Sequence, residues 1–144
     1  MDSIKDIQEE IVEEFEMFSD WMEKYDYLIE LGKDLPLIDA QYKTDENIIK
    51  GCQSKVWLQA ELEGNKVRFT ADSDAIITKG IIGLLLEIFS GFTPQEIAAA
   101  ELYAIDKIGL KEHLSPNRAN GLTSMINKIK MTALAYRAKL NQNG

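Results

Sequence analysis

Apolar residues near the start of the chain recur every three or four positions, which is the spacing of one face of an α-helix. This set comprises Ile4, Ile7, Ile11, Phe15, Phe18 and Met22. Asp20 and Glu23 then form the pattern of a capping box for a second helix, which we expect to end at Gly32 in a left-handed C-terminal cap. The pattern predicts two amphipathic helices, followed by a loop over residues 33–46.

The middle of the chain switches to an alternation of apolar and polar residues, which is typical of β-strands. Residues 56–62 and 67–71 alternate in this way, and Glu63-Gly64-Asn65 lies between them as a turn. A hairpin alone is only marginally stable, so other elements must cover it. Residues 47–49 can supply a short third strand.

Residues 75–89 are apolar on most sides, as expected of a buried central helix. Residues 72–74, Asp-Ser-Asp, offer side chains that could cap its N-terminus. Gly80 and Gly83 lower the helix propensity of this segment. We therefore expect them to allow close packing of the helix against the sheet.

Two further helix starts follow. Thr93-Pro94-Gln95-Glu96 combines a capping box with a proline in the first turn, and Leu114-Ser115-Pro116 precedes a long helical pattern that reaches Tyr136. The order of elements predicts an α+β fold, with a small antiparallel sheet of a hairpin plus a short third strand packed by helices. No linker rich in Pro, Gly or Ser divides the chain, so residues 1–144 should form a single domain.

Charge is distributed unevenly along the chain. The net charge is -8, and residues 1–46 hold 15 Asp and Glu against 4 Lys. This acidic balance argues against nucleic acid as a partner, because phosphate binding requires many basic contacts. The acidic helices fit either a solvated surface or a surface that steers a basic protein partner.

Nothing in the sequence predicts membrane association. No segment approaches the roughly 20 apolar residues that span a bilayer. The acidic first residues resemble neither a secretory signal nor a transit peptide. A single cysteine cannot form an internal disulfide, so we expect a cytoplasmic protein.

The single cysteine, Cys52, is the strongest candidate for chemistry. A cysteine reacts as the thiolate, which nearby cations and N–H groups stabilise. Lys50 adds a positive charge beside it, Gly51 allows a tight bend, and Gln53 and Ser54 add polar groups. A free cysteine is commonly a small buried apolar residue. These polar neighbours favour a reactive thiol in a loop, although the sequence leaves open whether Cys52 is buried or exposed at rest.

Several other site classes lack the residues they need. A cysteine hydrolase requires a histidine base, and the only histidine, His113, has no supporting motif, although spacing leaves a Cys52–His113 pair open. Structural zinc and iron–sulfur clusters need three or four Cys or His ligands. Glycine-rich phosphate-binding motifs are absent from the sequence. We therefore expect no metal and no cofactor bound by this chain.

A series of motifs resembles the SufE family, the sulfur acceptors of cysteine desulfurases in iron–sulfur cluster assembly. In chain order they are EKYDYLIELG at 23–32, GCQSKVW at 51–57, ADSDA at 71–75 with Lys79-Gly80, Thr93-Pro94, and HLSPNRANGL at 113–122. The resemblance extends from about Phe15 to about Tyr136. Each motif is weak alone, but their order and spacing together are specific.

The resemblance implies a fold similar to the iron–sulfur scaffold proteins. It also implies that Cys52, at a loop tip, takes persulfide sulfur from a SufS-type desulfurase, stimulates that enzyme and passes the sulfur to a scaffold complex. Pyridoxal phosphate (PLP) would belong to the desulfurase, and this chain would be an accessory protein, monomeric or a weak homodimer. A loop over residues 47–55 that shields the sulfur and then swings out would protect it. The alternatives are a single-cysteine redox sensor or thiol peroxidase, and a regulator that binds the desulfurase without accepting sulfur.

Two further residues come from the family pattern. Asp74 either caps the central helix or contacts a partner. Arg118 either places a guanidinium near the Cys52 loop, where it would favour a thiolate or persulfide anion, or stabilises the fold through an ion pair. Trp57 is expected to pack rather than to dock a partner.

Overall fold

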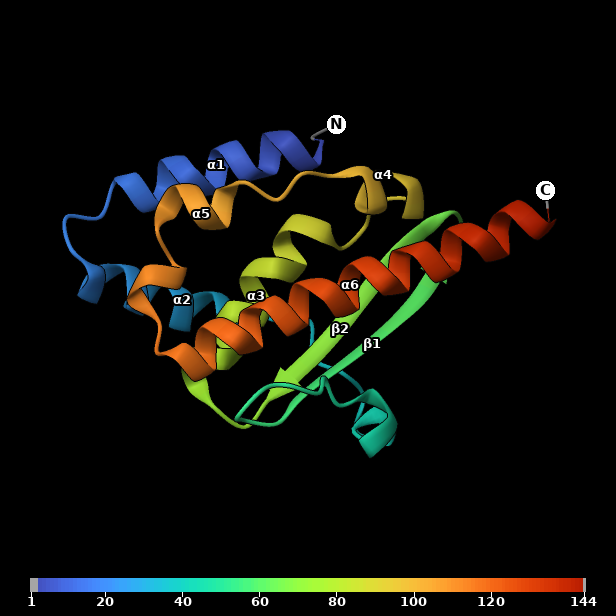
Figure 1. The fold of residues 1–144 in the computed structure, drawn as a ribbon, viewed down its shortest axis with the longest axis horizontal. Helices are drawn as coiled ribbons and strands as arrows, with labels where there is room; N and C mark the ends of the chain where they lie inside the picture. Colours follow the sequence, from blue (N-terminus) through green and yellow to red (C-terminus); the bar gives the residue numbers. More distant parts are fainter. Residues whose placement is uncertain (1–2, 144) are drawn as a thin grey trace.

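The computed structural model describes residues 3–143 and confirms the α+β class (Figure 1). The helices are α1 Ile4–Glu16, α2 Trp21–Lys33, α3 Ile76–Phe89, α4 Pro94–Ala99, α5 Ala104–Ile108 and α6 Pro116–Asn143. The strands are β1 Val56–Glu63 and β2 Lys66–Ser73, and short 3₁₀ turns lie at Ala40–Tyr42, Asp45–Asn47 and Lys111–His113. Within this described part of the chain, no helix combines the length and apolar character needed to cross a bilayer.

The sheet is an antiparallel hairpin of β1 and β2, paired from Val56 with Ser73 to Glu63 with Lys66. The prediction of a third strand at residues 47–49 is wrong. Ile48 makes one isolated antiparallel bridge to Trp57, and the Ile49 N–H donates to the Val56 carbonyl at 2.8 Å. The pairing stops there because the 3₁₀ turn Asp45–Asn47 lies before it and the bend at residue 51 lies after it.

The α3 helix lies at the centre of the molecule, as its apolar sequence predicts. It contacts β2, α1, α2 and α6, and Figure 1 shows α6 crossing in front of the hairpin while α1 and α5 lie side by side. The largest fully buried side chains are Phe15, Leu28, Phe69, Ile81, Ile82, Leu84, Leu85, Ile88, Phe89, Ile97, Ile105 and Leu110. One core therefore joins the N-terminal helices to the hairpin and to the later helices.

The glycines of α2 and α3 serve a helix–helix contact, which corrects two expectations. Gly32 lies inside α2, and the residue that caps this helix is Asp34 with φ -93°, so there is no left-handed glycine cap. A Cβ atom on Gly80 would overlap the carbonyl oxygen of Leu28 in α2, and one on Gly83 would lie 3.0 Å from the Leu31 oxygen. These glycines let α2 and α3 approach each other closely. They do not serve the predicted close packing of α3 against the sheet.

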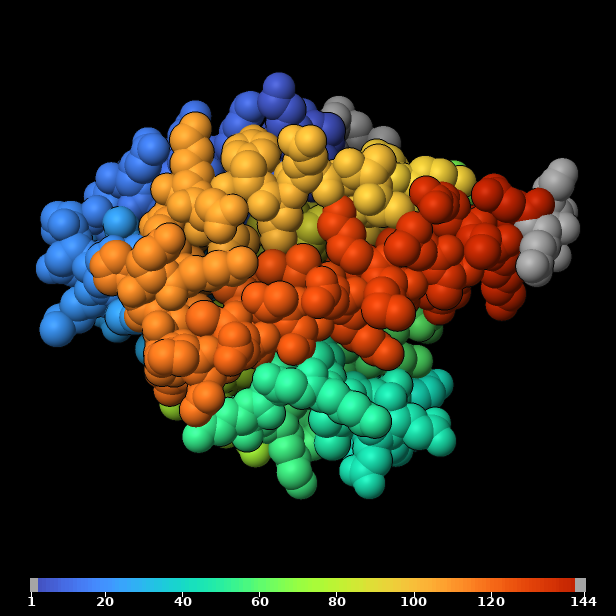
Figure 2. Space-filling view, viewed as in Figure 1, coloured from blue at the N-terminus to red at the C-terminus, as the bar shows by residue number. Residues whose placement is uncertain are grey.

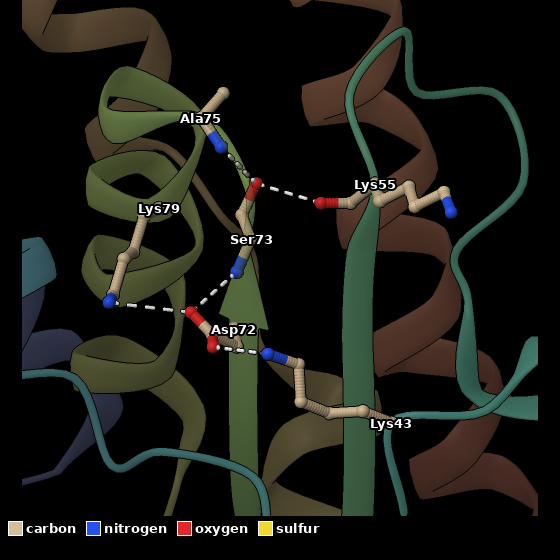
Figure 3. A network of polar contacts seen from close by, with 6 residues as sticks. All are labelled: Lys43, Lys55, Asp72, Ser73, Ala75 and Lys79. Carbon is tan, nitrogen blue, oxygen red and sulfur yellow. Dashed lines mark hydrogen bonds and ion pairs between the residues drawn. The ribbon is translucent and has the colours of Figure 1, made fainter. Parts of the chain in front are cut away.

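The expected caps of α3 also differ from the structure. The helix begins at Ile76, and its N-cap residue Ala75 makes no side-chain capping bond. Figure 3 shows where neighbouring side chains go instead: the Ser73 hydroxyl accepts from the Ala75 N–H at 3.3 Å, and Asp72 pairs with Lys43 and Lys79. The polar residues before α3 thus bind Lys43 of another segment, and they contact Ala75 and Lys79 at the start of α3 without a capping bond.

Candidate functional site

Cys52 lies in the loop before β1, with its side chain half-buried between α3 and α6. The Cys52 Sγ donates to the carbonyl oxygen of Gly121 in α6 at a separation of 3.6 Å. Beside the sulfur is a hollow of about 60 Å³, lined by Cys52, Gln53, Ser54, Thr78, Ile81, Asn117, Arg118, Gly121 and Met125. At rest, the thiol is therefore tucked against the long C-terminal helix rather than freely exposed.

The loop enters this position through a bend at Gly51. Gly51 has φ +95°, a conformation that other residues rarely adopt. A Cβ atom on Gly51 would also lie 2.5 Å from the Ser124 Oγ of α6. Both the backbone angle and the space therefore require glycine, in agreement with the tight bend expected from the sequence.

The loop leaves the site through an anchored residue, Lys55. Its N–H donates to the Asp74 carboxylate at 3.1 Å, and its carbonyl accepts from the Asp74 N–H at 3.2 Å. The Ser73 hydroxyl donates to the same carbonyl at 2.8 Å (Figure 3). Asp74 therefore does not cap α3. It fixes the end of the Cys52 loop to the residues between β2 and α3.

A second set of contacts holds the segment ahead of the loop on the hairpin. The Lys43 Nζ lies 2.9 Å from the Asp72 carboxylate and 4.6 Å from the centre of the Trp57 ring. Asp72 also pairs with Lys79 of α3 at 3.4 Å (Figure 3). These partners favour the carboxylate and hold the pKa of Asp72 below its usual range, although partial burial opposes this. Trp57 thus packs under Lys43, as expected.

Contacts at the loop tip are weaker than those at its ends. The Gln53 side-chain oxygen accepts from the Asn117 amide at 3.4 Å, and both residues are exposed. Ser54 lines the hollow beside the sulfur. The side-chain contacts that hold the tip to α6 are thus a long hydrogen bond from the Asn117 amide and the hydrogen bond of the Cys52 thiol.

The electrostatics of the site favour the neutral thiol at rest. Burial raises the pKa of the Cys52 thiol, because the thiolate loses solvation. Arg118 lines the hollow and is exposed, and it makes no ion pair with any residue in the described range 3–143. The structure therefore places Arg118 near Cys52, while its effect on a sulfur anion stays a prediction.

His113 is held elsewhere. Its ring stacks on Trp21 with the ring centres 3.8 Å apart, and its Nδ1 lies 3.0 Å from the Gly109 carbonyl oxygen. It is not among the residues that line the hollow. Nothing in this geometry supports a Cys52–His113 hydrolase. Across residues 3–143, no group of three His, Cys, Asp or Glu side chains is arranged to hold a metal ion.

Sequence reasoning missed the contribution of Gly121 as the wall behind the sulfur. A Cβ atom there would lie 3.3 Å from the Cys52 Sγ and 3.7 Å from the Cys52 Cα. Gly121 is also buried inside a helix, where glycine is normally unfavourable. That unusual placement, within the motif at 113–122, is the signal that could have identified it.

Gly121→Ala is therefore expected to press a methyl group against the sulfur, which must move by a few tenths of an ångström and becomes less sheltered. At neutral pH the raised pKa keeps the thiolate fraction of Cys52 below that of a free cysteine, and exposure would reverse this shift. We expect alkylation by iodoacetamide at pH 7 to become several-fold faster, and the pH midpoint of the rate to fall. Intact mass spectrometry over a pH series measures both.

Asn120→Ala is the matched control, because Asn120 is exposed on the same helix and does not line the hollow. Its alkylation profile should follow that of the wild type. Equal rates for the Gly121→Ala variant and the wild type would show that Gly121 does not hold the thiol in place.

Known proteins match this chain over most of its length. A family model described as the SufE, Fe-S metabolism associated domain matches residues 9–133. A SufE-like protein of Rhizobium meliloti is 42% identical over 130 residues, covering 87% of this chain and 93% of the relative. A SufE-like protein of Rhizobium etli is 41% identical over 130 residues, covering 87% of this chain and 88% of the relative.

The fold also has a solved counterpart. The solution structure of a hypothetical protein from Thermus thermophilus superposes with a TM-score of 0.76, covering 92% of this chain and 96% of the other. At 21% identity, this likeness shows the fold alone. The family match and the two close relatives identify the lineage: the chain belongs to the SufE family, whose domain is associated with Fe-S metabolism.

Proposed function

We propose that Cys52 accepts sulfur as a persulfide from a PLP-dependent, SufS-type cysteine desulfurase and passes it to an iron–sulfur scaffold complex. Family membership supports a role in Fe-S metabolism. The observation that carries the proposal is the position of the only thiol, at a loop tip with its sulfur in a hollow of about 60 Å³. A carrier needs such shelter, because a persulfide left in water is open to reduction and oxidation.

The transfer step balances without an added oxidant or reductant. The Cys52 thiolate attacks the outer sulfur of the desulfurase persulfide, a new sulfur–sulfur bond forms on Cys52, and the desulfurase cysteine leaves as a thiolate. Removing the persulfide would free the desulfurase for another turnover, so we expect this chain to stimulate that enzyme. PLP acts only in the desulfurase, on L-cysteine.

The attack requires Cys52 to leave the hollow. The loop ends are fixed by the Ile49–Val56 bond and by the Lys55–Asp74 pair, whereas the tip contacts are longer. This contrast supports a swing of the tip between two fixed ends. Outside the hollow, the thiol regains solvent and its thiolate becomes accessible.

The raised pKa of Cys52 favours a carrier over a peroxide sensor. A sensor must react in its resting state, and peroxide oxidation depends on an exposed thiolate. A carrier needs its thiolate only when the loop has opened at the partner. We place this exchange in the cytoplasm, with the chain acting as a monomer or a weak homodimer.

Intact mass spectrometry tests the proposal directly. The wild type is incubated with the cognate desulfurase and L-cysteine, and we expect a mass gain of one sulfur atom that a thiol reductant removes. The gain should be absent without L-cysteine and absent from the Cys52→Ser variant. An active cognate desulfurase that leaves the wild-type mass unchanged would overturn the proposal.

A further inference from the structure

A second hollow lies away from Cys52, between β1 and the later part of α6. It is a groove of about 490 Å³ lined by Asn47, Leu58, Gln59, Ala60, Lys128, Met131, Thr132, Ala135, Tyr136 and Lys139. In Figure 2, a green part of the hairpin is visible between α6 in red and the segment around residue 45 in teal. None of the residues that line the Cys52 hollow lines this groove.

The β1 edge beside this groove carries unpaired backbone groups. Val56 and Ala60 turn their carbonyls away from β2, towards the Ile49 N–H and the Tyr136 hydroxyl respectively. Because backbone direction alternates along a strand, Leu62 also turns its N–H and C=O outward. In the described range 3–143, the N–H groups of Ala60 and Leu62 have no hydrogen-bond partner.

This edge already accepts one isolated backbone bridge at one end. Ile48 forms its antiparallel bridge with Trp57, and the chain before it then turns away in the 3₁₀ turn Asp45–Asn47. A strand edge with unpaired backbone groups is a template on which an extended peptide adds a strand. The same groove presents an apolar contact in Met131, which is 67% exposed.

The charges of the groove select the occupant. The charged residues in its lining are Lys128 and Lys139, both exposed, and the lining contains no carboxylate, although the chain has a net charge of -8. Burial, together with the nearby Glu61, raises the pKa of Tyr136. The Tyr136 hydroxyl therefore stays protonated and bonded to the Ala60 carbonyl at 3.0 Å.

We propose that this groove docks an extended acidic segment of a partner protein, which adds a strand to β1 and places carboxylates near Lys128 and Lys139. The N–H groups of Ala60 and Leu62 would supply affinity through backbone hydrogen bonds, while the Ala60 carbonyl stays bonded to Tyr136. The two lysines would select acidic sequences. The inference does not rest on sulfur transfer, because Cys52 takes no part in the groove.

The probe is a capped synthetic peptide of alternating valine and glutamate, titrated into ¹⁵N-labelled protein. We expect amide shifts confined to residues 58–62 and 128–139, and hydrogen exchange at the Ala60 amide slowed by roughly tenfold or more at saturation. A Lys128→Glu, Lys139→Glu double variant should bind roughly tenfold more weakly. Cys52→Ser should bind like the wild type, which separates this test from that of sulfur transfer.

A second double variant, Lys107→Glu with Lys111→Glu, makes the same change in net charge outside the groove and should bind like the wild type. Equal loss of affinity in both double variants would show that overall charge alone controls binding, and would overturn the proposal. Equally tight binding of a valine–lysine peptide, shifts centred elsewhere, or no binding at all would also overturn it.

Discussion

Cys52→Ser is expected to abolish stimulation of the desulfurase while the variant still binds that enzyme. Serine is close to cysteine in size but cannot hold a persulfide, so the desulfurase must release its sulfur by a slower route. Because Cys52 is half-buried and makes one weak side-chain hydrogen bond, the free energy of unfolding should change by less than about 1 kcal/mol. Alanine release from L-cysteine measures the stimulation, and titration calorimetry measures the binding.

Ser54→Ala provides the matched control, since it alters the same loop and lines the same hollow but keeps the thiol. It should retain most of the stimulation. Full stimulation by Cys52→Ser would refute the carrier and identify a regulator that changes the desulfurase by binding alone. Loss of both binding and stimulation in Cys52→Ser, but not in Ser54→Ala, would instead make the thiol part of the docking surface.

Local periodicity predicted most of the fold. The alternation at residues 56–62 and 67–71 located both strands, and the capping box of Thr93 with Glu96 is present as expected. The errors concern long-range packing. The role of Gly32 and Gly80 depends on how closely two helices cross, which local pattern does not encode, so a glycine near a helix end resembled a cap.

At the site, too, local features were predictable from the sequence and long-range contacts were not. The bend at Gly51 follows from its own sequence context, and the structure has it with φ +95°. Asp74 was expected to cap α3 or to contact a partner. Its bond to Lys55 could not be foreseen, because that bond depends on the hairpin bringing the two residues together. Gly121 is 69 residues from Cys52, and only the packing of α6 over the loop reveals that its missing side chain makes room for the sulfur.

Gly80→Ala is expected to destabilise the protein by about 2 kcal/mol or more, despite the better helix propensity of alanine, which alone would stabilise α3 by about 1 kcal/mol. The new methyl group would overlap the Leu28 carbonyl oxygen and lie 2.7 Å from its carbon. These are backbone atoms of α2, so no side-chain rotation relieves the overlap, and the two helices must separate. Equilibrium unfolding in urea, followed by circular dichroism, measures the loss as a lower midpoint.

Gly83→Ala is the matched control on the same helix, with the same gain in propensity. Its methyl group would lie 3.0 Å from the Leu31 oxygen, a tight contact that a small shift relieves, so its loss should be clearly smaller than that of Gly80→Ala. If Gly80→Ala were as stable as the wild type, α2 and α3 would not cross as closely as described. Because Thr78 and Ile81 of α3 line the Cys52 hollow, separation of the helices should also speed alkylation of Cys52 in the Gly80→Ala variant. That coupling would show that the α2–α3 contact holds in place the wall that shelters the thiol.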